Sequence, residues 1–354
     1  MQRRALLAAP LLAPPLLGLA AAPAAAQPAG VAMDEMLIPG GDPGIQLYLR
    51  NKRPEAATPA RPDRTILCVH GATYPASTTF DLAVGGVSWM DYMAGRGFDV
   101  WCLDLRNYGR STREAAMGQP PEANPPLTRG AVAQKDIAAA AAHIRELRGL
   151  PKIMHLGWSW GSSLQARFAA DNPALVERLV LYAPQWLREG PSPAAAAGAA
   201  GEGPLGAYRS VTRAQARARW MNGVPEAQRG RLFPAGWYEH WADSTFATDP
   251  EGMRQVPSVL RAPNGVLQDS REFWQAGKPY YDPAAITAPT LVVLAEWDQD
   301  TPPSMAMALF PLLTASPGKR LVLLGGGTHG IMLERQRGAL FQAVQVFLEE
   351  AIGG

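Results

Sequence analysis

Several features that define other protein classes are scarce in this sequence. Only two cysteines, Cys68 and Cys102, occur among 354 residues, which excludes a disulfide scaffold. No uncharged apolar run of membrane-spanning length occurs beyond the N-terminus. Once Arg3 and Arg4 are assigned to an N-terminal leader, the 31 remaining basic residues balance 31 acidic ones. A neutral chain gives no electrostatic argument for binding nucleic acid or an anionic membrane.

The N-terminus has the pattern of an export signal. Gln2-Arg3-Arg4 is a positive start, residues 5–22 are apolar, and residues 24–26 are small, as at a cleavage site. We therefore predict a signal peptide over residues 1–26 and a periplasmic or secreted product. The paired arginines loosely resemble a twin-arginine signal. A retained membrane anchor is the alternative, although Pro10, Pro14 and Pro15 disfavour a stable spanning helix.

The chain is 47% apolar and long enough for one large core, with or without a lid. Up to Ala183, short apolar runs typical of doubly covered parallel strands alternate with segments of helical periodicity. The alternation stops after Ala183 and resumes at Thr290. We therefore predict a core formed by residues 27–183 and 287–354, with residues 184–286 inserted between its two parts.

The insertion contains no convincing strand, and its residues 214–221 and 234–241 are predicted to be helical. Aromatic side chains crowd this region. Most of them are expected to join the insertion to the core, and a few to line an apolar substrate cleft. They are Trp220, Phe233, Trp237, Tyr238, Trp241, Phe246, Phe273, Trp274, Tyr280 and Tyr281.

The most informative stretch is Gly157-Trp158-Ser159-Trp160-Gly161. A short apolar run ends at it, and an alanine-rich helical pattern follows at once. Between a strand and a helix, this pentapeptide predicts a tight turn that exposes the serine hydroxyl above a sheet edge. The glycines are expected because a β-carbon at either position would collide with a neighbouring strand or helix. A chance glycine-serine turn is the alternative, and the flanking strand and helix disfavour it.

The pentapeptide resembles the nucleophile elbow of the α/β-hydrolase family. The segment Asp104–Ser111 is similar to the family's Asp-x-Arg-Gly-x-Gly-x-Ser loop, with Asn107 in place of the first glycine. In this loop Asp104 and Arg106 are interpreted as structural. The resemblance implies an α/β fold with a mostly parallel eight-stranded sheet, helices on both faces and a helical lid over residues 184–286.

A strand that ends in His70-Gly71 carries the resemblance further. In the family, the residue after this glycine and the residue after the nucleophile donate backbone N–H groups to the oxyanion. These residues are Ala72 and Trp160 here. The His70 side chain is expected to shape the loop by hydrogen bonds rather than to contact substrate. The resemblance also makes the strands of Cys68 and Cys102 neighbours, so a disulfide is conceivable, although two buried free thiols are preferred.

The family's catalytic order is nucleophile, acid, histidine. Of the five histidines, only His329 lies in a glycine-rich loop after a final strand, so the resemblance makes it the base. Asp298, after the strand at 290–295, is the preferred acid, and Asp300 is the alternative. Parallel strands bring such loops to one edge of the sheet, where an imidazole can activate the Ser159 hydroxyl and a carboxylate can orient the imidazole.

The predicted activity is hydrolysis of a carboxylic ester or lactone through an acyl-enzyme on Ser159. The expected partner is a small-molecule substrate with an apolar part, and no metal or organic cofactor is expected. Carbon–carbon bond hydrolysis uses the same triad and is an alternative. A catalytically silent binder on a hydrolase scaffold is disfavoured because no triad member is missing.

Amide or peptide hydrolysis is a further alternative because Gly-Trp-Ser-Trp-Gly-Ser is similar to the elbow of proline iminopeptidases. Those enzymes recognise a free amine with lid carboxylates. The available carboxylates in the insertion are Glu226, Glu239, Asp243 and Glu251.

Overall fold

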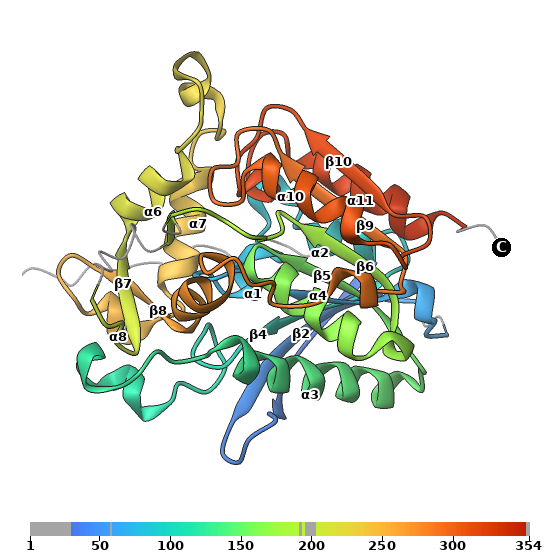
Figure 1. The fold of residues 1–354 in the computed structure, drawn as a ribbon, viewed down its shortest axis with the longest axis horizontal. Helices are drawn as coiled ribbons and strands as arrows, with labels where there is room; N and C mark the ends of the chain where they lie inside the picture. Colours follow the sequence, from blue (N-terminus) through green and yellow to red (C-terminus); the bar gives the residue numbers. More distant parts are fainter. Residues whose placement is uncertain (1–29, 57–58, 191–192, 195–202, 352–354) are drawn as a thin grey trace, which may run out of the picture.

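The computed structural model describes residues 30–56, 59–190, 193–194 and 203–351; the predicted signal peptide lies outside them. Its centre is an eight-stranded sheet with the order β1-β2-β4-β3-β5-β6-β9-β10 (Figure 1). The pairs β1–β2 and β2–β4 are antiparallel and the others are parallel, which confirms the predicted sheet. The strands are β1 (Val31–Pro39), β2 (Gln46–Pro54), β3 (Thr65–Val69), β4 (Asp99–Asp104), β5 (Ile153–Trp158), β6 (Val176–Tyr182), β9 (Thr290–Ala295) and β10 (Arg320–Leu324).

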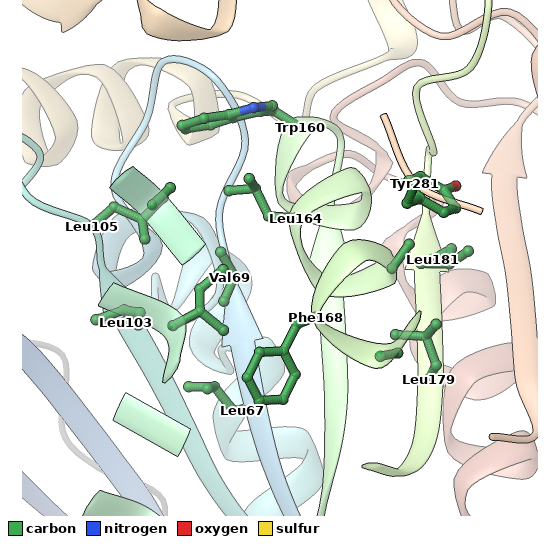
Figure 2. Close-up of a cluster of buried hydrophobic side chains, with 14 of the residues drawn as sticks. Leu67, Val69, Leu103, Leu105, Trp160, Leu164, Phe168, Leu179, Leu181 and Tyr281 are labelled. Carbon is green, nitrogen blue, oxygen red and sulfur yellow. The ribbon is translucent and has the colours of Figure 1, made fainter. Parts of the chain in front are cut away.

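Helices cover both faces of the sheet because successive strand residues point to opposite faces. Leu67 and Val69 of β3 pack into one apolar cluster with α3 (Gly130–Arg148), α4 (Trp160–Asp171) and α10 (Pro303–Leu309). Figure 2 shows part of this cluster, with side chains of α4 against those of β3. Ile66 and Cys68 pack on the other face, with α1 (Ala76–Thr79), α2 (Trp89–Ala94) and α11 (Arg337–Glu349). The continuous apolar runs of the sequence reflect this double burial.

Cys68 and Cys102 lie opposite each other on the paired strands β3 and β4. Both side chains are fully buried and both thiols are free, as the preferred interpretation of the sequence expected. Direct neighbours on adjacent strands have poor geometry for a disulfide.

The insertion differs from the sequence prediction. It contains a two-stranded antiparallel sheet, β7 (Tyr208–Thr212) and β8 (Val259–Pro263), where no strand was predicted. Each strand has only five residues and carries a buried arginine, so neither has a strong strand signal. The two strands are far apart in sequence, so there is no hairpin turn between them from which their pairing could be predicted. The insertion also contains the helices α6 (Arg213–Trp220), α7 (Trp237–Phe246), α8 (Pro250–Met253) and α9 (Gly265–Asp269).

The topology brings four distant loops to one edge of the sheet. Because β3, β5, β9 and β10 run parallel, their carboxyl ends lie on the same side. The loops that follow these strands contain Ala72, Ser159, Asp298 and His329, respectively. In Figure 1 the elements α6, α7, β7 and β8 of the insertion, drawn in yellow and orange, lie to one side of the eight-stranded sheet.

Candidate active site

Ser159 occupies a strained turn between β5 and α4. Its backbone has φ 56° and ψ −122°, a conformation that non-glycine residues rarely adopt. A β-carbon at Gly157 would clash with the carbonyl of Gly161, and one at Gly161 would clash with the carbonyl of Val69. The two glycines therefore allow α4 to start close against β5 and β3. This close approach holds the serine at the apex of the turn.

His329 lies in the loop after β10, and both its backbone and its ring are held. Its carbonyl oxygen accepts hydrogen bonds from Trp158 Nε1 at 2.9 Å and from the Tyr182 hydroxyl at 2.8 Å. Its Nδ1 lies 2.7 Å from Oδ2 of Asp298. Its Nε2 is buried and has no hydrogen-bond partner within the described chain. One ring nitrogen is thus bound by a carboxylate, and the other remains available.

The Asp298 carboxylate is fully buried and saturated with donors. Its Oδ1 accepts the backbone N–H groups of Asp300 and Thr301, both at 2.9 Å, and its Oδ2 accepts the Thr301 hydroxyl at 2.9 Å. The Asp300 carboxylate instead accepts hydrogen bonds from Arg219 Nε at 2.9 and 3.1 Å. Of the two candidate acids, the structure therefore brings Asp298 into contact with His329.

The electrostatic surroundings favour the protonated form of His329. Burial by itself would lower the pKa of the imidazole, but the charges of Asp298 and Asp300 and the Asp298 hydrogen bond outweigh burial. The Arg219 guanidinium opposes them in part. The net result is a His329 pKa above its ordinary value of 6.5. The carboxylates thus stabilise the imidazolium that forms when the ring takes a proton.

The loop after β3 lies against the serine. A β-carbon on Gly71 would come within 3.0 Å of Ser159 Cβ. The backbone N–H groups of Ala72 and Trp160 donate to no acceptor among the described residues. Trp160 is the first residue of α4, where a helical N–H has no internal partner. Two free N–H groups therefore flank the serine, as an oxyanion site needs.

His70 is hydrogen-bonded within the protein. Its Nε2 accepts the backbone N–H of Leu105 at 3.1 Å, so the proton is on Nδ1, which lies 2.7 Å from the carbonyl oxygen of Gly71. Burial lowers the pKa of this imidazole. The ring is fully buried and does not line the cavity beside Ser159. These contacts agree with the expectation that His70 shapes the loop.

Asp104 and Arg106 also have internal partners. Asp104 accepts the backbone N–H groups of Ser77 and Arg110 at 3.1 Å each, and Arg106 pairs with the buried Asp136. Asn107, which replaces a glycine of the family pattern, adopts φ 69°. Asparagine tolerates this left-handed conformation better than most residues, so the loop keeps its shape.

Ser159 and His329 line one cavity, which has about 470 Å³ of empty space including its open mouth. Its surface is mainly apolar. Of the ten aromatic residues noted in the insertion, Trp220 and Trp241 line it. Its lining residues are Ala72, Thr73, Tyr74, Thr79, Trp158, Ser159, Ala216, Arg219, Trp220, Trp241, Asp300, His329, Gly330 and Leu333.

Several residues that support the site have no motif in the sequence. Glu334 accepts hydrogen bonds from Trp220 Nε1 at 2.6 Å and from the Thr328 backbone at 3.0 Å, and it contacts the Thr328 hydroxyl. Burial raises the pKa of Glu334 to about 7. Arg219 reaches the cavity from α6. No periodicity identifies these residues, because Glu334 contacts Trp220, 114 residues away, and Arg219 contacts Asp300, 81 residues away.

The four carboxylates that could have recognised an amine lie elsewhere. None of them lines the cavity, and each forms an ion pair with an arginine. The pairs are Glu226 with Arg229, Glu239 with Arg217, Asp243 with Arg213, and Glu251 with Arg261.

Within the described ranges, no group of three or more His, Cys, Asp or Glu side chains is arranged to hold a metal ion. In the same ranges, no helix has the length and apolar character needed to cross a membrane.

The comparisons with known proteins agree on the fold. The sequence model of a family described as alpha/beta hydrolase fold matches residues 64–336. No curated protein matches the chain. Many solved structures do, at identities that show the fold alone.

Three of these structures illustrate the likeness. The 2-hydroxy-6-oxo-6-phenylhexa-2,4-dienoate hydrolase of Rhodococcus sp. strain RHA1 is 18% identical with a TM-score of 0.62, covering 90% of this chain and 100% of that one. A bacterial membrane phospholipase A described as a virulence factor is 18% identical with a TM-score of 0.59, covering 90% and 86%. A thermophilic esterase from Thermogutta terrifontis is 19% identical with a TM-score of 0.55, covering 90% and 100%.

Proposed function

The chain belongs to the α/β-hydrolase family, and from this premise we propose that it is a serine hydrolase cleaving a carboxylic ester or lactone through an acyl-enzyme. One observation carries the proposal. The strained Ser159 and the unpartnered Nε2 of His329 belong to one apolar cavity, and Asp298 contacts the opposite ring nitrogen at 2.7 Å. Structures named as an esterase and a phospholipase are among the similar folds.

Acylation begins when Ser159 Oγ attacks the substrate carbonyl carbon and passes its proton to His329 Nε2. Asp298 keeps the other ring proton on Nδ1 and stabilises the imidazolium. The carbonyl oxygen becomes an oxyanion that accepts hydrogen bonds from the N–H groups of Ala72 and Trp160. Each such donor is worth roughly 3–4 kcal/mol of the barrier. His329 then gives its proton to the leaving alcohol as the ester bond breaks.

Deacylation repeats these steps with water. His329 takes a proton from a water molecule that attacks the acyl carbon, and the acid leaves as Ser159 regains its proton. The variant Ser159→Ala would remove the nucleophile of this cycle, and His329→Ala would remove its general base. The apolar walls that Trp158, Trp220 and Trp241 contribute support a substrate with an apolar part.

An ester or lactone is preferred to an aminoacyl amide on the contacts of the insertion. A free amine would need an unpaired carboxylate beside the cavity. Asp300 lines the cavity, but Arg219 already pairs with it, and the other carboxylates considered pair with arginines outside the cavity.

A fluorophosphonate probe tests the nucleophile. The protein should be labelled, and Ser159→Ala should abolish labelling. Ser163→Ala is the matched control, because its hydroxyl donates to the Gln185 carbonyl and does not line the cavity. Folded wild-type protein that resists labelling would favour a silent binder over an enzyme.

The substrate class is tested with p-nitrophenyl esters of graded chain length alongside aminoacyl-anilides. Ester turnover that rises with acyl length and then falls is expected from a bounded apolar cavity. Faster turnover of the anilides would replace the ester proposal by the amide alternative.

We also propose that residues 1–26 direct export of the chain. This segment lies outside the described residues, so the proposal depends on its sequence pattern alone. Cell fractionation with N-terminal sequencing should find the shortened protein outside the cytoplasm. An intact N-terminus on cytoplasmic protein would contradict export.

A further inference from the structure

The carbonyl of Ala72 is held by two side chains from different parts of the molecule. The Tyr108 hydroxyl donates to it at 3.0 Å, and Arg209 Nη2 donates to it at 2.9 Å. Arg209 Nη2 also donates to the Thr73 hydroxyl oxygen at 2.8 Å. Tyr108 belongs to the loop after β4, whereas Arg209 is on β7 of the insertion.

The same guanidinium holds the strand that pairs with β7. Arg209 Nη1 donates to the carbonyl oxygens of Pro263 at 2.7 Å and Ala262 at 3.4 Å, both on β8. Arg209 therefore connects the two-stranded sheet of the insertion to the loop beside Ser159. Only 4% of the residue is exposed, so these contacts are shielded from water.

The partners of Arg209 are all neutral. No carboxylate of the described residues forms an ion pair with it, whereas Arg261 on the adjacent strand pairs with Asp249 at 2.6 Å. Burial lowers the pKa of Arg209 to about 10, so the guanidinium remains charged near neutral pH. A buried charge without a counter-ion is costly, and it attracts any negative charge that develops nearby.

We propose that Arg209 is a positioning residue for the oxyanion site, acting through the Ala72 carbonyl; this inference rests on the proposed serine hydrolase function. The Ala72 N–H belongs to the peptide unit whose carbonyl, that of Gly71, is held by His70. Arg209 and Tyr108 hold the carbonyl of the next peptide unit. With both units fixed, the N–H direction is set before the oxyanion forms, and preorganised donors of this kind stabilise the transition state.

The test compares Arg209→Lys with Arg261→Lys, since both change a buried arginine of the same two-stranded sheet. Lysine cannot span four acceptors on two segments as the guanidinium does. Arg209→Lys should lower kcat for p-nitrophenyl butyrate by about 10- to 100-fold, part of the loss seen when an oxyanion donor is removed, with KM within about threefold. Arg261→Lys should keep kcat within about threefold of wild type.

A second readout separates positioning from general loosening of the fold. A trifluoromethyl ketone forms an oxyanion with the serine, whereas the matching methyl ketone binds mainly as a neutral molecule. Arg209→Lys should weaken the trifluoromethyl ketone by the same factor as kcat and leave the methyl ketone nearly unchanged. Tyr108→Phe removes the other donor to Ala72 without changing the ring, so it should give a smaller loss in the same direction.

The outcomes are distinct. If Arg209→Lys does not fold, Tyr108→Phe decides the matter through the ratio of the two ketone affinities. Folded variants at positions 209 and 108 with the wild-type ratio would overturn the inference, as would an Arg261→Lys loss as large as that of Arg209→Lys. Wild-type protein that neither cleaves the ester nor binds the trifluoromethyl ketone would instead overturn the proposed function.

Discussion

The core loops and the insertion contribute to the same cavity by different means. The loops after β5, β9 and β10 carry Ser159, Asp298 and His329, and strand order with close backbone packing sets their positions. The insertion contributes long side chains that reach the core: Arg209 contacts the loop after β3, and Trp220 contacts Glu334 after β10. The core thus carries the candidate reacting groups, whereas the insertion supplies part of the cavity wall and contacts the loops beside it.

The largest expected effect separates a core histidine from one in the insertion. His329→Ala should lower kcat by about 10⁴-fold, because the serine loses its base. His240→Ala, an exposed residue of α7, should keep wild-type kcat. Steady-state kinetics with a p-nitrophenyl ester measures both. If His329→Ala lowered kcat less than tenfold, the base would not be this histidine of the core.

The next effect compares two carboxylates two residues apart. Asp298 contacts His329 of the core, whereas Asp300 pairs with Arg219 of the insertion. Asp298→Asn should lower kcat by roughly 10³- to 10⁴-fold because the imidazole loses the acceptor that fixes its tautomer. Asp300→Asn should lower kcat by less than about tenfold. The same kinetic assay ranks them, and the reverse order would exchange their roles.

A third experiment probes the contact between the two regions at Glu334, which binds Trp220 of the insertion and Thr328 of the core. Because burial raises its pKa from 4.5 to about 7, the folded state binds this proton more tightly than the unfolded state. The protonated Glu334 carboxyl therefore contributes on the order of 3 kcal/mol to the free energy of unfolding. This contribution is full below about pH 4.5 and is lost as the pH rises through about 7.

Glu334→Gln should remove this dependence, since an amide does not titrate. The measurement is the free energy of unfolding in urea at pH 5 and pH 8, compared between wild type and variant. Equal pH dependence in the two proteins would show that the Glu334 carboxyl is not responsible.

The smallest effect is a shift in the pH profile. His329 must be neutral to accept a proton, so kcat/KM falls as pH drops through its pKa. Asp300→Asn removes a charge that raises this pKa and leaves Arg219, which lowers it, without its partner. Both changes move the acidic limb of the kcat/KM profile to lower pH. An unmoved or oppositely shifted limb would contradict this electrostatic picture.

Local signals were enough to predict the core and the loops of the site. The elbow sequence specified the turn at Ser159, because Gly157 and Gly161 lie where β-carbons would clash. Apolar runs marked the parallel strands, since these are buried on both faces. The strands β7 and β8 were missed because charged residues interrupt their short runs and their pairing partners are distant in sequence.

The supporting contacts could not be predicted in the same way. The family resemblance preferred Asp298 to Asp300 as the acid, but only the turn geometry shows that one carboxylate contacts His329 and the other contacts Arg219. Nothing near Arg209 in the chain indicates the Ala72 carbonyl, which lies 137 residues away.

The sequence by itself determined the fold class and the order of the candidate reacting groups, because glycine placement and apolar periodicity act over a few residues. The tertiary structure alone decided which carboxylate meets His329 and which insertion side chains reach the loop at Ala72. Those contacts form between segments brought together only by the folded sheet and the insertion packed beside it, so no local pattern encodes them.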